Sequence, residues 1–134
     1  MRSFELDPAR SLDTQNNLAW VLAQDPPTAQ RALDLARRVT AADPANAYYW
    51  DTRAEAARRV GDAEDANSSW AKCMDLFETA KGEGRLRQVR IALRYATFLR
   101  ERNEIDAART VAMRARRWAQ GTDAARDLDR FLGK

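Results

Sequence analysis

Residues that could carry out chemistry are sparse in this chain. Histidine is absent, which removes the commonest general base, the commonest zinc ligand and any Ser–His or Cys–His pair. Cys73 is the only cysteine, so no internal disulfide can form, and we expect it to be a small buried hydrophobe. Gly-rich phosphate loops, metal-ligand spacings and nucleophile elbows are missing as well. The sequence therefore predicts no enzymatic activity, no catalytic residue, no metal site and no cofactor.

One group of ionisable residues has a spacing that brings its members together. Asp51, Glu55 and Arg58 could share one face of a helix. A catalytic role is one interpretation of such a face, but a surface ion-pair cluster explains the same residues at least as well.

Arginine is unevenly distributed along the chain. Residues 1–80 contain 9 basic and 13 acidic residues, a net charge of −4, whereas residues 81–134 contain 14 and 7, a net charge of +7. The basic residues of the second half are nearly all Arg, whose guanidinium suits bidentate contacts with carboxylate or phosphate. This charge has three interpretations. It could bind an acidic protein partner, it could bind nucleic acid or another polyanion, or it could be a merely solvated helical face that reflects a GC-rich bacterial coding background. Nucleic acid is the less favoured partner, because the acidic first half opposes a long phosphate track and no base-reading motif occurs.

The elements that would position these residues are clearest between residues 47 and 78. Apolar or small residues recur every three to four positions, which predicts an amphipathic helix up to Val60. Gly61 ends this helix, because glycine adopts the left-handed conformation without strain, and Asp62 caps a second one. The two buried faces are expected to carry Trp50, Ala54, Ala57 and Val60, then Ala66, Trp70, Cys73, Met74 and Phe77. One such helix hairpin cannot bury its own apolar face, so similar neighbours are expected.

This segment resembles a tetratricopeptide repeat (TPR), a helix hairpin of about 34 residues. Six of its residues stand at the characteristic positions of that family: Trp50, Ala54, Ala57, Gly61, Ala66 and Trp70. Three others depart from it, since Arg53 replaces the preferred Leu, Cys73 an Ala and Glu78 the closing Pro. The resemblance implies an all-α fold, an α-solenoid of antiparallel helix pairs with a C-terminal capping helix.

The same pattern divides the whole chain into a single TPR-like domain, 1–134. Its predicted parts are the end of a preceding repeat or an N-terminal segment (1–11), repeat 1 (12–45), repeat 2 (46–80), a linker or helix extension (81–88), repeat 3 (89–121) and a capping helix (122–134). In repeat 1, Pro26 and Pro27 end the first helix, and Thr28 caps the second helix. In repeat 3, Asn103 makes the turn. Gly121 ends the second helix of that repeat, and Thr122 caps the last helix. The inner faces of repeat 3 are expected to carry Ala92, Tyr95, Ala96 and Leu99, then Ala108, Ala112 and Ala115. The apolar stripe of the last helix is expected to be Ala124, Ala125, Leu128, Phe131 and Leu132.

The beginning of the sequence matches the close of a repeat. Phe4-Glu5-Leu6-Asp7-Pro8 has the apolar, acidic, Leu-Asp-Pro pattern, and Asp43-Pro44 repeats its last two residues. We therefore expect a longer protein upstream, or alternatively a short native segment that packs as a cap. An uncapped first repeat would also expose apolar surface through which two copies could associate.

The family resemblance implies a concave groove that holds a peptide or a partner helix. Positions carried over residue by residue give the expected groove residues: Asn16, Asn17, Trp20, Tyr48, Asp51, Glu55, Arg58, Arg90, Arg94, Thr97 and Arg100. Trp20 and Tyr48 are possible anchors, although packing between neighbouring helices explains them too. A carboxylate clamp known in part of the family is not predicted, because only Arg90 and Arg94 match its positions.

The function expected from the sequence is accordingly a protein–protein interaction module or scaffold, part of a larger protein, that binds a peptide or partner helix. The two alternatives are polyanion binding by the Arg-rich half and self-association. Composition fits a helix-rich protein with 45% hydrophobic and 32% charged residues. No apolar run approaches the length of a membrane span and no secretory signal occurs, so the cytoplasm is the default expectation.

Overall fold

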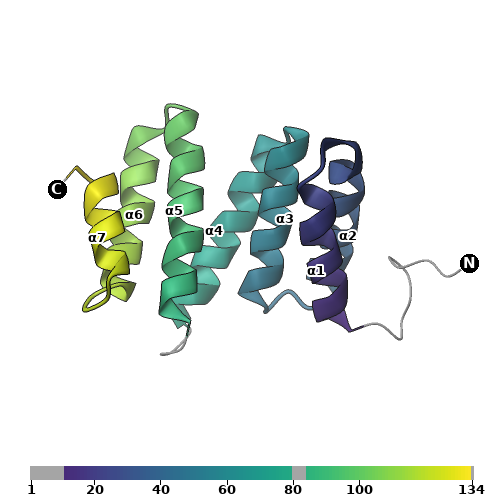
Figure 1. The fold of residues 1–134 in the computed structure, drawn as a ribbon, viewed down its shortest axis with the longest axis horizontal. Helices are drawn as coiled ribbons and strands as arrows, with labels where there is room; N and C mark the ends of the chain where they lie inside the picture. The colour runs from purple at the N-terminus through teal and green to yellow at the C-terminus, as the bar shows by residue number, and fades with distance from the viewer. Residues whose placement is uncertain (1–10, 80–83, 134) are drawn as a thin grey trace, which may run out of the picture. The chain divides into compact units, whose positions relative to one another are not determined.

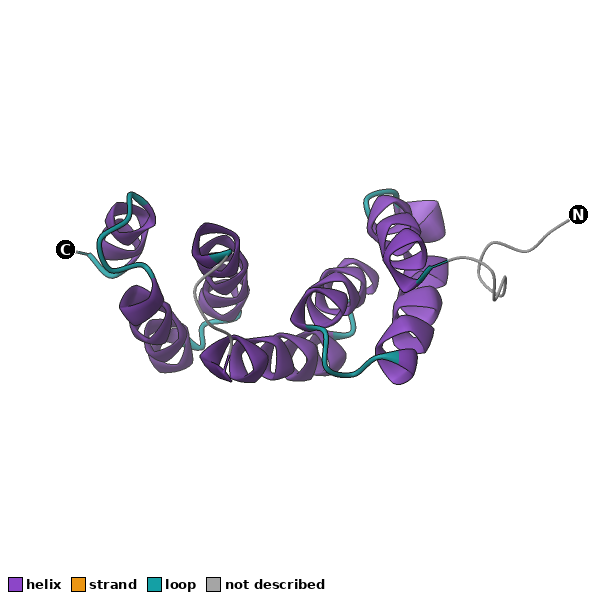
Figure 2. Ribbon diagram, turned by 90° about the horizontal axis from the view of Figure 1, so that it is seen from below, coloured by secondary structure: helices purple, strands orange, loops and turns teal. Residues whose placement is uncertain are grey.

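A computed structural model describes residues 11–79 and 84–133, in which every element is helical and no strand occurs (Figure 2). The chain divides into two compact units, Met1–Thr79 (unit 1) and Ala80–Lys134 (unit 2), and each is described by itself. Residues 1–10 of the predicted N-terminal segment (1–11), residue 80 of repeat 2 and residues 81–83 of the predicted linker (81–88) lie outside the described residues. The repeat boundaries stay predictions, but each predicted repeat contains one helix pair.

Unit 1 consists of two antiparallel helix pairs. The helices are α1 (Leu12–Ala23), α2 (Ala29–Ala42), α3 (Ala47–Val60) and α4 (Ala63–Thr79), with a short 3-10 helix, η1 (Pro26–Thr28), between the first two. Helix α1 packs against α2 and α3, and α3 packs against α2 and α4 (Figure 1). This arrangement lets every helix of the unit bury its apolar face against a neighbour.

Local sequence determines where the helices of unit 1 begin and end. Ser11 and Asn46 cap α1 and α3, their side chains accepting the N–H groups of Thr14 at 3.1 Å and Tyr48 at 3.0 Å. Gly61 ends α3 with φ 87°, a left-handed conformation that favours glycine. Asp62 then caps α4 by accepting the N–H of Asp65 at 3.0 Å, as predicted.

Thr28 stands at the predicted cap position but makes a different bond. Its side chain accepts no N–H of α2; the hydroxyl instead donates to the carbonyls of Leu22 at 2.7 Å and Asp25 at 3.2 Å. Thr28 thus closes the turn after α1, and the predicted side-chain cap is wrong. The Pro-Pro break itself is confirmed, because both prolines lie in η1.

The core of unit 1 is built from small residues on the close-packed faces and large ones on α4. The predicted inner face of α4 is confirmed: Ala66, Trp70, Cys73, Met74 and Phe77 are all buried. Ala54 and Ala57 of α3 are buried as well. Trp50 and Val60 differ, because each is only half-buried. The Trp50 indole N–H donates to the Pro44 carbonyl at 2.8 Å.

Unit 2 contains one helix pair, α5 (Arg85–Glu101) and α6 (Ile105–Trp118), followed by the short helix α7 (Ala124–Phe131). Asn103 makes the turn between the pair with φ 63°, as predicted. The expected inner faces are buried: Ala92, Tyr95, Ala96 and Leu99 of α5, and Ala108, Ala112 and Ala115 of α6. Residues 85–88, assigned from the sequence to a linker or helix extension, form the first turn of α5.

The C-terminal helix packs against both helices of the pair. Its anchor is Leu128, which is fully buried, with Ala124 and Leu132 beside it. Two local predictions need correction here. Helix α6 already ends at Trp118, before Gly121, and Thr122 does not cap α7, because its hydroxyl donates to the Ala119 carbonyl at 2.5 Å. No helix in residues 11–79 and 84–133 is long and apolar enough to cross a bilayer.

Candidate functional site

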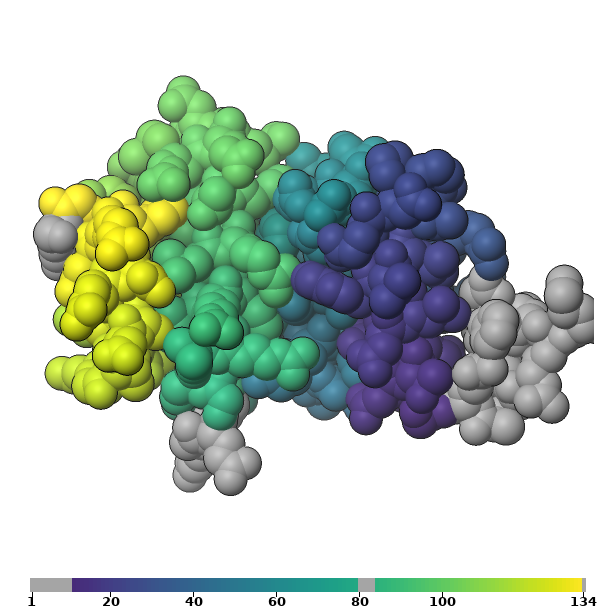
Figure 3. All heavy atoms as spheres, viewed as in Figure 1, coloured from purple at the N-terminus to yellow at the C-terminus, as the bar shows by residue number. Residues whose placement is uncertain are grey.

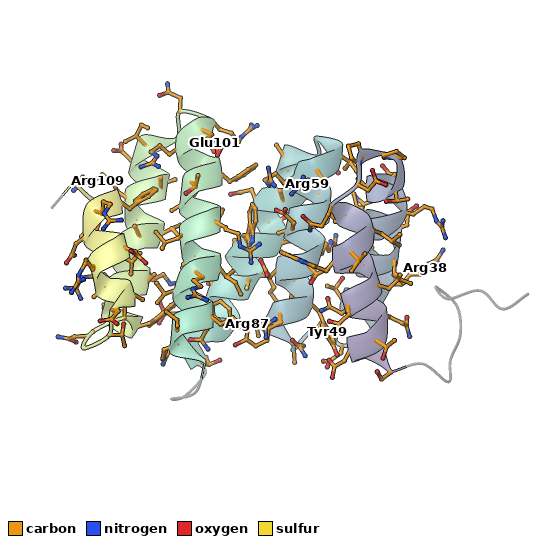
Figure 4. The ribbon with its side chains drawn as sticks, in the orientation of Figure 1. Arg38, Tyr49, Arg59, Arg87, Glu101 and Arg109 are labelled. Atoms are coloured by element: carbon orange, nitrogen blue, oxygen red, sulfur yellow. The ribbon has the colours of Figure 1, made fainter. Side chains whose placement is uncertain are left out.

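In unit 1 the predicted groove residues lie on α1 and α3, which pack against each other. Two hydrogen bonds join these helices near opposite ends of α3, where Tyr49 and Arg59 are labelled in Figure 4. The Tyr49 hydroxyl donates to Asp13 at 2.6 Å, and the Arg59 guanidinium donates to the Gln24 side chain at 2.9 Å. Burial, together with the bond to Asp13, raises the pKa of Tyr49 to about 12. The tyrosine therefore stays a neutral donor at ordinary pH.

Asn16 lies one turn along α1 from Asp13 and is buried, with 9% of its surface exposed. Its side-chain Oδ1 finds no hydrogen-bond donor among the described residues. Asn17, the next predicted groove residue, is exposed, and Trp20 is half-buried. Figure 3 shows that side chains of α1 and α3, purple to blue-teal, form one face of unit 1. The exposed part of α1 that could meet a partner therefore includes Asn17 and part of Trp20.

Asp51 is a buried carboxylate that bonds another helix of unit 1. It is 4% exposed, and its carboxylate accepts the indole N–H of Trp70 at 3.0 Å. The bond links α3 to the buried face of α4, which explains how an aspartate can lie in the core. Little of Asp51 is therefore left to contact a partner, although its place in the groove stays a prediction.

Glu55 is paired within its own helix. Its carboxylate accepts two bonds from Arg58 at 2.9 Å each and one from Arg59 at 3.0 Å, and it is 5% exposed. Burial alone would raise the pKa of Glu55, but the bonds from the two arginines outweigh it and hold that pKa below the usual range. An ion-pair cluster thus exists around Glu55, and Asp51 bonds to Trp70.

Part of the Tyr48 ring packs against Phe77 of α4. It is half-buried, and its ring lies 5.7 Å from the ring of Phe77, tilted by 55°. Such a tilted pair is a favourable aromatic contact. The remaining exposed edge of Tyr48 is what a partner could reach.

In unit 2 the predicted groove residues lie on one helix, α5. Arg90 and Arg100 are exposed, and Arg94 and Thr97 are half-buried. Sequence reasoning left out Leu86, which is 46% exposed and one of the largest exposed apolar side chains of the unit. Because Leu86, Arg90, Leu93 and Thr97 follow each other at intervals of three and four, they share one face of the helix. We call this set, together with Arg100, the α5 face.

The Arg100 guanidinium does not extend freely into solvent. It lies over the ring of Phe131 in α7, with its central carbon 4.1 Å from the ring centroid. Phe131 was expected only as part of the apolar stripe of the last helix. No sequence pattern links it to Arg100, because the contact depends on how α7 packs against α5.

Among residues 11–79 and 84–133, no group of three or more Cys, Asp or Glu side chains is placed to hold a metal ion. The polar groups of the two units are arranged as ion pairs, as bonds between helices and as exposed arginines. Such an arrangement is suited to holding another polar surface.

Comparison with known proteins bears on the fold. No sequence profile of a known protein family and no curated protein sequence matches the chain. Among solved structures, the chain is similar to the crystal structure of the Yersinia enterocolitica type III secretion translocator chaperone SycD in its alternative dimer. The TM-score is 0.71 at 13% sequence identity, covering 95% of this chain and 91% of that chain. The predicted all-α, TPR-like fold class is thereby confirmed, while membership of the TPR family stays a prediction.

Proposed function

We propose that the chain is a protein-interaction module, a scaffold or chaperone that holds a peptide or a partner helix on exposed faces of α1 and α3 in unit 1 and on the α5 face in unit 2. The observation that carries this proposal is the α5 face itself, where exposed arginines and exposed leucine share one side of a helix. A helix face that mixes exposed apolar and charged residues is suited to a polypeptide partner.

The structural neighbour supports the same role. SycD is described as a secretion translocator chaperone, and its fold covers nearly the whole of this chain. A fold alone does not determine function, so the weight of the proposal rests on the exposed residues.

Photo-crosslinking from single positions tests the proposal. A photoreactive residue would replace Asn17 on α1 or Arg90 on α5, and matched controls would replace Arg38 on α2 or Arg109 on α6. All four side chains are exposed. We expect polypeptide adducts from Asn17 and Arg90 and few from the controls. Equal crosslinking from all four positions would contradict a specific binding face.

Polyanion binding by the second half is the alternative function, favoured by its net charge of +7. A labelled single-stranded oligonucleotide at physiological salt would separate the two. Tight binding that an Arg90→Glu/Arg94→Glu variant abolishes would support the alternative, whereas loss of the polypeptide adducts alone would support the module. Self-association, the other alternative, predicts a mass that rises with concentration in light scattering.

A further inference from the structure

We propose that Phe131 is a positioning residue: it holds the Arg100 guanidinium so that Arg100 binds a carboxylate of an acidic polypeptide segment lying on the α5 face. This inference rests on the proposed function and adds the chemistry of the partner and the residue that sets it. Arg100 contacts the partner, and Phe131 acts through Arg100.

The geometry of the contact leaves the N–H groups of the arginine available. A guanidinium stacked on an aromatic ring uses its flat face, and its N–H groups point outward along the edge, where a carboxylate can accept two of them. Arg100 lies over the Phe131 ring at 4.1 Å and is still exposed, and it forms no ion pair with a described residue. Arg100 is therefore supported by the ring and is not neutralised by a carboxylate of the described residues.

The ring itself is held in place by the packing of α7. Leu128 anchors the helix in the core of unit 2. Asp129, two residues before Phe131, accepts from Arg116 of α6 at 2.8 Å. Because α7 is fixed to α6 by these contacts, Phe131 is a rigid support, and Arg100 loses less conformational entropy when a partner binds.

The neighbourhood of Arg100 favours an acidic polypeptide over another anion. Arg90 lies on the same helix, and the half of the chain that contains both has a net charge of +7. The α5 face also presents Leu93, which lies between them, and Leu86, which precedes Arg90 and is 46% exposed. Apolar side chains beside arginines match a segment in which carboxylates alternate with apolar residues, a feature that a phosphate backbone lacks.

Fluorescence anisotropy with a defined probe tests the inference. The probe is a short labelled peptide of alternating Leu and Glu with blocked ends, and its control has Gln in place of Glu. The variants are Arg100→Ala, Phe131→Leu, Phe131→Tyr and the double variant Arg100→Ala/Phe131→Leu. Arg109→Ala on α6 is the matched control, since it removes the same charge away from the α5 face. Hydrogen exchange of the α6 amides checks that unit 2 stays folded.

We expect the Glu peptide to bind and the Gln peptide to bind more weakly. Phe131→Leu should weaken binding of the Glu peptide about two- to fivefold, which is the effect of losing one exposed cation–π contact. Phe131→Tyr keeps an aromatic face and should restore binding. The double variant should bind no more weakly than Arg100→Ala alone, because Phe131 acts only through Arg100. Arg109→Ala should change little.

Three results would overturn the inference. Binding by Phe131→Leu at the wild-type level, no rescue by Phe131→Tyr, or additive losses in the double variant would each show that Phe131 does not act through Arg100. If the Glu peptide fails to bind while crosslinks to polypeptides still form from position 90, the acidic partner is wrong and the proposed function stands. If the Glu peptide does not bind and no crosslinks form from position 90, the proposed function fails as well.

Discussion

Unit 1 and unit 2 are both built of antiparallel helix pairs, but their arginines are held in different ways. In unit 1, Asp65 accepts hydrogen bonds from Arg37 at 2.8 and 3.0 Å, from Arg53 at 2.9 and 3.2 Å, and from Ser69 at 2.8 Å. This carboxylate is only 8% exposed and joins α2, α3 and α4. Arg37 and Arg53 thus cross-link helices of unit 1.

In unit 2, arginines are stacked on aromatic rings. Arg100 lies over Phe131 at 4.1 Å, Arg102 over Phe98 at 5.6 Å and Arg85 over Trp118 at 5.9 Å. Acidic residues are half as numerous as basic ones in this half of the chain, so fewer carboxylates are available to its arginines. The difference is one of degree, because Arg102 is also 3.8 Å from Glu104, and in unit 1 Arg53 both bonds Asp65 and lies 5.1 Å from the Trp50 ring. An arginine that only lies over a ring still has N–H groups that can bind a carboxylate, whereas one bonded to a buried carboxylate already donates several of them. Arg37 and Arg53 thus stabilise unit 1, whereas Arg100 has no carboxylate partner among the described residues.

The largest expected effect is the loss of stability of unit 1 at low pH. Burial alone would raise the pKa of Asp65, but the bonds from Arg53, Ser69 and Arg37 outweigh it and hold the pKa below the usual range, as the arginines do for Glu55. The unfolded chain therefore binds more protons in acid, and this stability is present above about pH 4 and lost below it.

Urea unfolding from about pH 7 to about pH 3 measures this loss. In a Trp118→Phe background, tryptophan emission comes only from unit 1, because the other three tryptophans lie there. We expect the urea midpoint of unit 1 to fall steeply through the carboxylate range, and less steeply in an Asp65→Asn variant. Identical pH profiles for the two proteins would show that Asp65 does not contribute.

Replacing Asp65 by Ala should be the largest single-residue effect. The change leaves Arg53 without its carboxylate partner and leaves Arg37 with only the Asp62 carboxylate, 3.2 Å away and 41% exposed. The loss of one partner from a largely buried ionic group destabilises by about 3 kcal/mol. Urea unfolding followed by unit 1 tryptophans gives the free energy of unfolding. A loss below about 1 kcal/mol, the range of exposed ion pairs, would contradict the view of Asp65 as a cross-link.

Trp70→Phe should have an intermediate effect. The ring stays, but the indole N–H that Asp51 accepts at 3.0 Å is lost, and leaving a buried acceptor without this donor destabilises by about 1–2 kcal/mol. Trp50→Phe is the matched control, since its indole bonds to the Pro44 carbonyl at an exposed position. A larger loss for the Trp50 variant than for the Trp70 variant would reverse our assignment of which tryptophan supports the core.

The parts of the fold that follow from short-range chemistry could be predicted from the sequence. The positive φ of Gly61 and Asn103, the Asp62 cap and the three-to-four spacing of buried residues depend only on neighbours within a turn or two. The predictions for Thr28 and Thr122 were wrong because a hydroxyl can bond either the next N–H or a preceding carbonyl, and the local sequence does not decide between them.

The site could be predicted less completely, because its key contacts join residues distant in sequence. Arg53 is recognisable as a departure from the repeat pattern, but its partner Asp65 is fixed only by the packing of α3 on α4. Phe131 and Arg100 lie on different helices in the same way. The exposed leucine at position 86 was accessible to helix-face reasoning and was missed because only family positions were considered.

The smallest effect is expected from a short ion pair in unit 2, between Arg116 and Asp129. Its guanidinium and carboxylate are 2.8 Å apart, but the two side chains are 36% and 33% exposed, so solvent screens their attraction. Asp129→Ala should lower the free energy of unfolding of unit 2 by about 0.5 kcal/mol. Hydrogen exchange of the α6 amides measures this loss of free energy. The reference is the loss in the Asp65→Ala variant, measured from the α4 amides. Equal losses in the two helices would mean that the units are held by the same chemistry, and the contrast between them would be wrong.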